Sequence, residues 1–459
     1  MPKQLEHDMT ASQAAAAMRA GDISAVELLE ALLARSERLE PRLGVWATLD
    51  VEYALDQARS RDRTFAAAGP TGPLHGVPVG IKDIYDTAGL RTAHGSPIFA
   101  DNVPARDATS VAKLREAGAV VMGKTVTTEF ACGDPPSTLN PWLSGRTPGG
   151  SSTGSAVGVA ARIFPLAMGS QTAGSVLRPA AYNGVVGFKP TMGRISRRGV
   201  LPVSWPVDTL GTFTRTVGDA AVALSVLSCH DPNDPFSLKS ADLSVAAPPD
   251  PPAGPHKIGL LRTFFLESCD NVVAGNVERV AARLEAAGAR VEELRPELGV
   301  DVVLAAHRTV MNVNAAAVHE RLFAQRPGDY SPDVRRTVEL GLLTPSTTYI
   351  QAERIRRAFR RKLMAAISPY DAVLTATTKE AGAPAPRTTG DPRWQAPLTT
   401  AGLPAISLPS GLSQDGLPLG VQMFAGPMLD ESLLRTAQWV ESVIGFSDAP
   451  PLDGSRDST

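Results

Sequence analysis

Three sets of residues in this sequence could together cleave an amide bond. Lys82 follows the apolar run 77–81, Ser151 lies in Gly149-Gly-Ser-Ser-Thr-Gly-Ser155, and Ser175 ends Gly169-Ser-Gln-Thr-Ala-Gly-Ser175. A serine hydroxyl becomes an effective nucleophile when a neighbouring base takes its proton. Burial in an apolar site lined with hydroxyl groups lowers the pKa of a lysine and keeps its amine neutral. A Lys–Ser–Ser relay drawn from these three sets would then replace a serine–histidine pair, without a metal or cofactor.

The glycines beside these serines have a physical use. They allow the backbone to approach a substrate closely and to adopt angles that a Cβ atom disfavours. Successive N–H groups could then point at one developing negative charge, which stabilises the transition state of acyl transfer. The candidates for this oxyanion hole are Thr172, Ala173, Gly174 and Ser175.

Helical and extended patterns predict an α/β framework around these residues. Residues 51–68 and 108–117 are expected to be helices, and Gly118 ends the second one. A buried strand is expected at 119–122, and a loop at 143–155 that leads into a helix at 156–162. This alternation is typical of a sheet with helices on its faces. The length of 459 residues permits one large α/β unit or two domains.

Two other segments match the sequence patterns of known functional motifs, but the structural context that each motif requires is missing. Gly118-Ala-Val-Val-Met-Gly-Lys-Thr125 fits a phosphate-binding loop, but its apolar strand lies between the glycines and leaves no loop for a nucleotide. Gly150-Ser-Ser-Thr-Gly154 fits a nucleophile elbow with Ser152 as the nucleophile, although 142–148 makes a poor preceding strand. Because histidines follow later in the sequence, a nucleophile elbow at Ser152 remains a weaker alternative.

Composition narrows the classes of function. The formal net charge of −2 disfavours a nucleic-acid surface, and the basic helix expected at 347–367 is better explained as a solvated face. His75 and His94 are expected to be packed loop residues, and the scattered histidines form no metal-binding pattern. The three separated cysteines, the absence of an apolar leader and the absence of an 18-residue apolar run predict a cytoplasmic protein without a membrane span.

Motifs over most of the chain resemble those of the amidase signature family. Besides the three sets above, 72–78, 401–405 and 416–422 are similar to family landmarks, whereas 230–395 is poorly covered. Shorter matches lie at 106–109, 187–190, Asp208 and 215–217. The resemblance implies one α/β domain over 1–459, with a twisted mixed sheet flanked by helices on both faces.

The resemblance also implies roles for the residues of the site. Lys82 would be the base, Ser151 the bridging serine held by a cis peptide bond, and Ser175 the nucleophile. Arg178 would either anchor a substrate carboxylate or form a structural salt bridge, and Asp208 would orient backbone near the site. Ser152 would cap or pack the following helix. The complete set of expected supporting residues is Gly149, Gly150, Ser152, Arg178 and Asp208.

Four positions depart from the family pattern. Thr153 and Ala173 stand where glycine is usual, Gln171 where aspartate is common, and Val126 where asparagine is frequent. None of these changes removes a triad member. Ala173 still has an N–H to donate, and its methyl group would trim the pocket.

The domain is expected to divide into functional parts. These are N-terminal helices at 1–68, a catalytic core at 72–220, a surface connection at 231–256, a variable pocket-forming part at 257–395 and a C-terminal core part at 396–447. The connection is inferred from its richness in proline, alanine and aspartate.

Substrate class is the least determined property. The pocket walls are expected from 130–146 and 300–345, whose apolar side chains include Met311, Leu322, Phe323, Leu340 and Leu342. Few fixed charges there favour a small neutral amide, partly aromatic, or a carbamate. The alternatives are a urethanase and the A subunit of a glutamine-dependent tRNA amidotransferase. No cofactor is expected, and the chain would be a monomer or a homodimer.

Overall fold

One mixed β-sheet organises the chain. The computed structural model describes residues 6–239, 256–384 and 388–452. In these ranges eleven strands form one sheet in the order β1-β3-β2-β4-β6-β5-β10-β11-β9-β7-β8. Their bounds are β1 Trp46–Leu49, β2 Pro78–Lys82, β3 Val120–Thr125, β4 Leu166–Gln171, β5 Val186–Lys189, β6 Thr209–Thr214, β7 Lys257–Leu261, β8 Arg290–Leu294, β9 Ala372–Ala376, β10 Ala405–Leu412 and β11 Pro418–Phe424.

The direction of pairing changes along the sheet. Strand β2 runs parallel to β3 and β4, and β7 runs parallel to β8 and β9. The pairs from β4 through β6, β5, β10 and β11 to β9 are antiparallel. Every residue of β2, β3 and β4 is buried, as expected for parallel strands covered on both faces. Side chains at the carboxyl ends of these strands are therefore screened from water.

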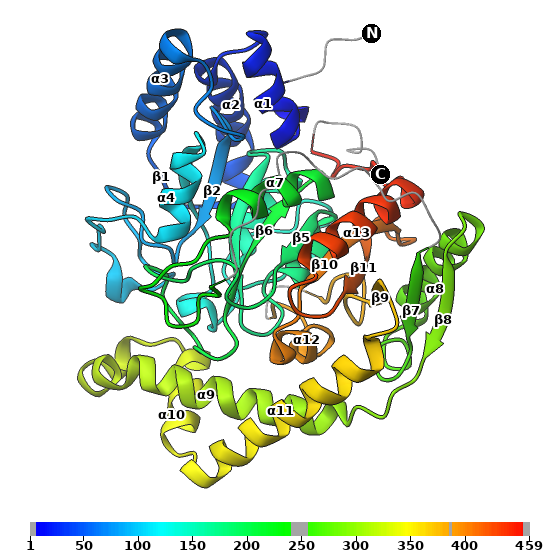
Figure 1. Cartoon of the computed structure of the whole chain (residues 1–459). Coiled ribbons are helices and arrows are strands. Elements are labelled where there is room, and N and C mark those ends of the chain that lie inside the picture. The colour runs from blue at the N-terminus through cyan, green and yellow to red at the C-terminus, as the bar shows by residue number, and fades with distance from the viewer. Residues whose placement is uncertain (1–5, 240–255, 385–387, 453–459) are drawn as a thin grey trace.

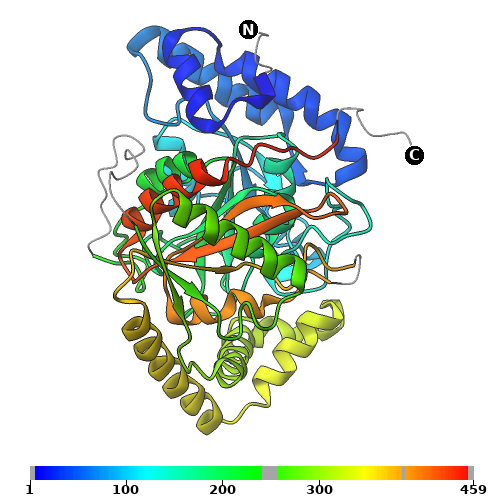
Figure 2. The same ribbon diagram turned by 90° about the vertical axis from the view of Figure 1, so that its right-hand side faces the viewer.

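Helices flank the sheet and cap two ends of the molecule. Figures 1 and 2 show α1–α3 at one end and α9–α11 at the opposite end, with the sheet between them. Helix α8 contacts β8 to β11, and α5 contacts β2, β3, β4 and β6. The helices are α1 Ala11–Ala20, α2 Ala25–Leu43, α3 Val51–Ala68, α4 Thr109–Glu116, α5 Thr153–Ala160, α6 Leu177–Asn183, α7 Val217–Leu227, α8 Asn271–Ala286, α9 Val300–Gln325, α10 Pro332–Leu342, α11 Ser346–Ile367, α12 Ala396–Ala401 and α13 Asp430–Ile444.

Two large apolar clusters form the core. One lies around β2, β3 and β4 and includes α1–α5. The other lies around β5, β10, β11, β9 and β7 and includes α8 and α13. Because a continuous sheet carries both clusters, they belong to one α/β domain. The prediction of a single large α/β domain with a mixed, helix-flanked sheet is confirmed.

Local predictions agree with the structure where the sequence marks the ends of an element. Helix α3 spans the predicted 51–68: Asp50 accepts a hydrogen bond from the N–H of Tyr53 at its start, and Gly69 follows its end with φ 78°. Helix α11 matches 347–367 within one residue. The loop expected up to residue 155 is shorter, because α5 already begins at Thr153.

The expected surface connection at 231–256 is only partly described, since 240–255 lies outside the described residues. Its first part differs from a simple linker. Asp231 is buried and accepts hydrogen bonds from the hydroxyls of Thr109 and Ser196, both at 2.7 Å. Of the helices in the described ranges, none has the length and apolarity required to cross a bilayer.

Candidate active site

Lys82 ends β2 in a fully buried position. Its Nζ donates to the Oγ of Ser151 at 2.7 Å and to the Oγ of Ser170 at 2.8 Å. Burial lowers the pKa of this amine from 10.5 to about 7, and the negative charge of Asp208 opposes part of that shift. At neutral pH a large fraction of the amine is therefore unprotonated and able to accept a proton.

The loop that carries Ser151 is fixed from several sides. The Gly150–Ser151 peptide bond is cis. The carbonyl of Gly150 accepts from Nη2 of Arg178 at 2.7 Å, and the carbonyl of Ser151 accepts from the N–H of Thr128 at 3.3 Å. Gly149 has φ 77°, and a Cβ there would lie 2.8 Å from the Cα of Pro179. The loop can therefore pass close to α6 only with glycine at 149.

Gln171 shapes the loop that leads to Ser175. Its Oε1 accepts from the N–H groups of Val176 and Leu177 at 2.8 and 3.0 Å, and its Nε2 donates to Thr399 at 2.9 Å. The hydroxyl of Thr399 donates in turn to the carbonyl of Ala173 at 2.8 Å. An amide side chain thus accepts the hydrogen bonds at the start of α6 where the family commonly has a carboxylate.

The loop between Gln171 and Ser175 has backbone N–H groups without a hydrogen-bond acceptor among the described residues. Within the described part of the chain, the N–H groups of residues 172–175 donate to no protein acceptor, and the hydroxyl of Ser175 has no hydrogen-bond partner. Ser175 is 8% exposed, so it lies at the edge of the interior. Free N–H groups beside a free hydroxyl suit the binding of a developing oxyanion.

Asp208 stabilises backbone next to the same loop. Its Oδ1 accepts from the hydroxyl of Thr172 at 2.6 Å, and its Oδ2 accepts from the N–H groups of Val203 and Ser204, both at 2.8 Å. Burial raises the pKa of this carboxyl, and these hydrogen bonds oppose the increase. The carboxylate is occupied by protein donors, an arrangement suited to orienting backbone.

Arg178 follows the Ser175 turn on α6. Nη2 donates to the carbonyl of Gly150 and to the hydroxyl of Thr389. The residue is only 4% exposed, and in the described residues its Nε and Nη1 have no hydrogen-bond partner. No carboxylate of the described chain lies within salt-bridge distance. Arg178 therefore ties the Ser151 loop to the segment near 389 and keeps two donors uncommitted.

The residues of the two disfavoured motifs have structural contacts. Ser152 is fully buried, and its hydroxyl bonds to the backbone of Ser170, so it does not stand free as a nucleophile. Strand β3 occupies most of the phosphate-loop match, and Nζ of Lys124 donates to the carbonyl of Tyr85 and to Thr92, both at 2.6 Å. Asp83 lies 3.5 Å from the same Nζ.

The two loop histidines and the basic helix α11 make structural contacts. Nδ1 of His75 accepts from the N–H of Thr71, and the ring of His94 packs edge-on against Phe99. Among the described residues, no cluster of histidine, cysteine and carboxylate side chains could hold a metal ion. On α11, Arg356 donates to the carbonyls of Pro206 and Thr400, so this helix supports the site from outside.

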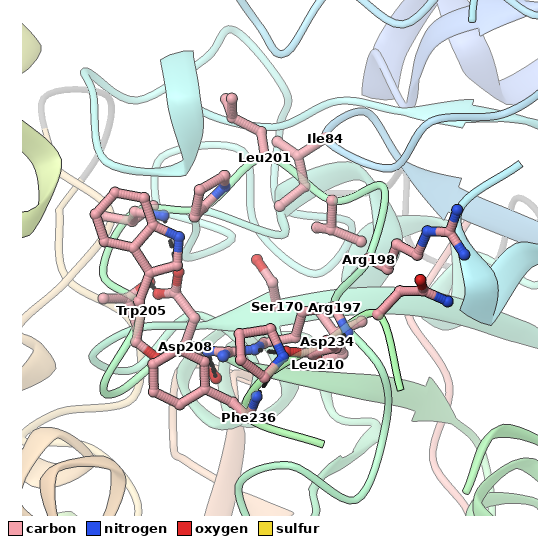
Figure 3. A pocket seen from close by; sticks show the side chains of 16 residues that line it. Ile84, Ser170, Arg197, Arg198, Leu201, Trp205, Asp208, Leu210, Asp234 and Phe236 are labelled. Atoms are coloured by element: carbon pink, nitrogen blue, oxygen red, sulfur yellow. Dashed lines mark hydrogen bonds and ion pairs between the residues drawn. The ribbon is translucent and has the colours of Figure 1, made fainter. Parts of the chain in front are cut away.

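A cavity of about 190 Å³ lies beside Ser170, the second partner of Lys82 (Figure 3). Ser170, Thr172 and Asp208 form part of its wall. The remainder comes from Ile84, residues 197–210 and residues 233–236. A smaller cavity of about 40 Å³ is lined by 135–139, 146–149, Thr153 and Thr388.

Residues 300–345, expected to form pocket walls, line neither of these two cavities. Leu322 and Phe323 pack against the aromatic cluster of Phe130 and Tyr330, and Met311 packs against the core. Leu340 and Leu342 are exposed. The apolar side chains of this stretch stabilise α9 and α10 rather than contact the cavity. The other predicted stretch, 130–146, contributes to the smaller cavity only.

Sequence reasoning missed two positioning residues. Ser170, the second partner of Lys82, is brought there by the pairing of β2 with β4, in which Ile81 lies opposite Met168. Thr399 comes from α12, more than two hundred residues beyond the Gln171 it contacts. The Gly169-Ser pair at the start of the nucleophile motif was the one signal that could have indicated Ser170.

Comparisons with known proteins agree with this geometry. The family model "Amidase" matches residues 27–434. A similar curated protein is the A subunit of the glutamyl-tRNA(Gln) amidotransferase of Picosynechococcus sp., 35% identical over 93% of this chain and 96% of that protein. The corresponding protein of Salinispora tropica is 35% identical over 96% of this chain and 99% of its own length.

Solved structures are similar over nearly the whole length. A 6-aminohexanoate cyclic dimer hydrolase has a TM-score of 0.88 and 28% identity, covering 98% of this chain and 99% of its own. A peptide amidase from Stenotrophomonas maltophilia has a TM-score of 0.86 and 29% identity, covering 97% and 99%. The sequence matches and the shared architecture together place this chain in the amidase (amidase signature) family.

Proposed function

We propose that this protein is an amidohydrolase that cleaves the C–N bond of small neutral amides through an acyl-enzyme on Ser175. The observation that carries the proposal is the buried amine of Lys82, which donates to Ser151 at 2.7 Å and, among the described residues, has no carboxylate partner within salt-bridge distance. Its pKa of about 7 supports a role as the base at neutral pH.

In the proposed reaction, Lys82 takes a proton from Ser151 while Ser151 takes the proton of Ser175. The Ser175 oxygen attacks the carbonyl carbon, and the oxyanion binds the N–H groups of residues 172–175. The proton on Lys82 returns through Ser151 to the departing amine, the C–N bond breaks, and an ester on Ser175 remains. Water then attacks this ester, with the same residues accepting its proton and returning it to Ser175.

Two variants test the assignment. Ser175→Ala should abolish turnover without changing the fold, and Lys82→Ala should lower kcat by orders of magnitude. The matched control is Ser442→Ala, which removes an exposed hydroxyl on α13 that bonds only the carbonyl of Trp439. The assay measures amine released from a panel of amides, esters and carbamates. Amidase activity retained by either site variant would contradict the assignment.

The carbamate arm of this panel tests the urethanase alternative, because a carbamate presents the same carbonyl and a C–N bond to the same serine. Preferential hydrolysis of carbamates over the corresponding amides would make urethanase the main activity. Trapping the acyl group on a Ser175 peptide by mass spectrometry would identify the nucleophile independently of the leaving group.

A second candidate function is that of an amidotransferase component. The observation that favours it is the 35% identity to curated amidotransferase A subunits over most of both chains. The candidate predicts glutamine-dependent activity that requires partner proteins. Turnover of simple amides by the purified chain alone would favour the amidohydrolase instead.

A further inference from the structure

We propose that the substrate carries one uncharged aromatic ring, and that this ring binds in the 190 Å³ cavity against Trp205 and Leu201 (Figure 3). The inference rests on the proposed function, because it describes the group attached to the amide that Ser175 would attack. It assigns substrate selection to the segments 197–210 and 233–236.

The size of the cavity limits the occupant. A cavity of about 150 Å³ lined by apolar side chains is large enough to bind benzene. The present cavity, at about 190 Å³, therefore has room for one six-membered ring with a short linker. Its apolar wall is made by Ile84, Val200, Leu201, Pro202, Val203, Trp205, Leu210, Pro235 and Phe236.

The Arg197 and Asp234 charges in the wall pair with each other, and the carboxylate of Asp208 is occupied by the hydroxyl and N–H donors described above. Nη1 of Arg197 donates to the carbonyls of Trp205 and Asp208 at 2.6 and 3.1 Å. The same guanidinium lies 3.7 Å from the carboxylate of Asp234 and stacks 4.4 Å from the centre of the Phe236 ring. A charged ligand would have to break these contacts to find a partner inside. The remaining cation of the wall, Arg198, is exposed to water.

Trp205 gives the cavity an aromatic surface. It is 38% exposed, whereas the other four tryptophans of the chain are all less exposed. A large indole left in water beside an apolar cavity is a surface that a planar ligand can cover, and aromatic rings favour offset or edge contacts with one another. Figure 3 shows the indole on one side of the cavity and Ile84 and Leu201 on another.

The cavity borders residues next to the reacting groups, while Lys82, Ser151 and Ser175 themselves do not line it. Ser170, which Lys82 contacts at 2.8 Å, and Thr172, the first residue of the proposed oxyanion loop, both belong to its wall. A ring that fills the cavity is therefore connected to the scissile carbonyl through few atoms. Phenylacetamide and 3-phenylpropanamide have this shape.

The first experiment compares kcat/KM for acetamide, benzamide, phenylacetamide and 3-phenylpropanamide. Burying one phenyl ring should raise kcat/KM about 10- to 100-fold over acetamide for the best phenyl substrate. Equal kcat/KM for acetamide and all phenyl compounds would overturn the inference.

The second experiment fills the cavity. Leu201→Trp should lower the preference for 3-phenylpropanamide over acetamide at least 10-fold, and Trp205→Ala should lower it severalfold while removing only a partly exposed side chain. The matched control is Leu343→Trp, which adds the same indole on the surface, where Leu343 is 80% exposed. A preference unchanged in both cavity variants would place the ring elsewhere.

A binding measurement separates the two proposals. Calorimetry on Ser175→Ala with 3-phenylpropanamide should detect binding that Leu201→Trp weakens in the same background. If the wild-type chain hydrolyses no amide but Ser175→Ala still binds the phenyl ligand in this way, the proposed function fails and the ring site stands. If acetamide is hydrolysed and the phenyl ligand does not bind, the ring site fails alone.

Discussion

Replacing Lys82 by methionine should remove activity and make the protein more stable at neutral pH. The pKa of about 7 in the folded protein compares with 10.5 for a solvated lysine. Because one pKa unit is worth about 1.4 kcal/mol, folding with this amine costs about 4 kcal/mol at pH 7. Methionine is apolar and similar in length, so it avoids that cost.

The gain is partly offset by the hydrogen bonds that Lys82 makes. The hydroxyls of Ser151 and Ser170 would each lose a donor, at about 1 kcal/mol each. The net stabilisation of Lys82→Met at pH 7 should therefore be about 2 kcal/mol. Lys82→Ala should fall between no change and a loss of about 3 kcal/mol there, because the cavity it leaves costs a further ~2–5 kcal/mol.

The sign of the effect depends on pH. The folded pKa lies below the unfolded pKa, so the unfolded chain binds more protons between about pH 7 and pH 10.5, and the stability of the native protein rises with pH in this window. At pH 10 less than about 1 kcal/mol of the cost remains. Lys82→Met should then be less stable than the native protein by about 1 kcal/mol, since the two lost hydrogen bonds outweigh the cost of desolvation that remains.

Urea unfolding at pH 7 and pH 10 measures both values. Lys362→Met, which replaces an exposed lysine on α11, is the control for the substitution itself. A Lys82→Met variant that is less stable than the native protein at both pH values would refute the reasoning, because the buried amine would then not be carrying a cost of desolvation.

Three further predictions concern catalysis. As pH rises through about 7, kcat/KM should increase and level off, because Lys82 loses its proton and becomes a base; a pH–rate profile without an inflection near 7 would argue against Lys82. Ser170→Ala should lower kcat roughly 10-fold and leave KM nearly unchanged, since it removes one contact of the Lys82 amine but no expected contact with the carbonyl; steady-state kinetics decide this. Gln171→Leu should lower kcat roughly 10- to 100-fold by releasing the N–H groups that begin α6, with Gln171→Glu recovering part of the loss; equal losses in both variants would mean that the accepted hydrogen bonds do not matter.

The fold was predictable to the extent that local signals mark it. Asp50 and Gly69 mark both ends of α3, and the helix-to-strand alternation around Gly118 indicates the α/β class. The resemblance adds the single mixed sheet. The order of strands could not be obtained from periodicity, because an apolar strand pattern does not name its neighbours.

The sequence predicts the reacting residues of the site better than it predicts the residues that contact them or form the cavity wall. The resemblance of the motifs to those of the family indicates Lys82, Ser151 and Ser175. Ser170 reaches the amine through strand pairing, and the cavity wall forms because Arg197 joins 205–208 to Asp234. Such contacts link positions far apart in the chain. Apolar residues at 300–345 looked like a pocket wall because burial against other helices requires the same composition.

The position of β10 and β11 in the sheet has a consequence for biosynthesis. These two strands, the last to emerge from the ribosome, lie between β5 on one side and β9 on the other. Until they are made, β5 and β9 each present an unpaired edge, and such edges invite pairing with other chains. We expect nascent chains that stall before residue 405 to require chaperones, because their sheet is interrupted between β5 and β9. In a full-length chain, the pairing of β10 and β11 with these two strands makes the sheet continuous.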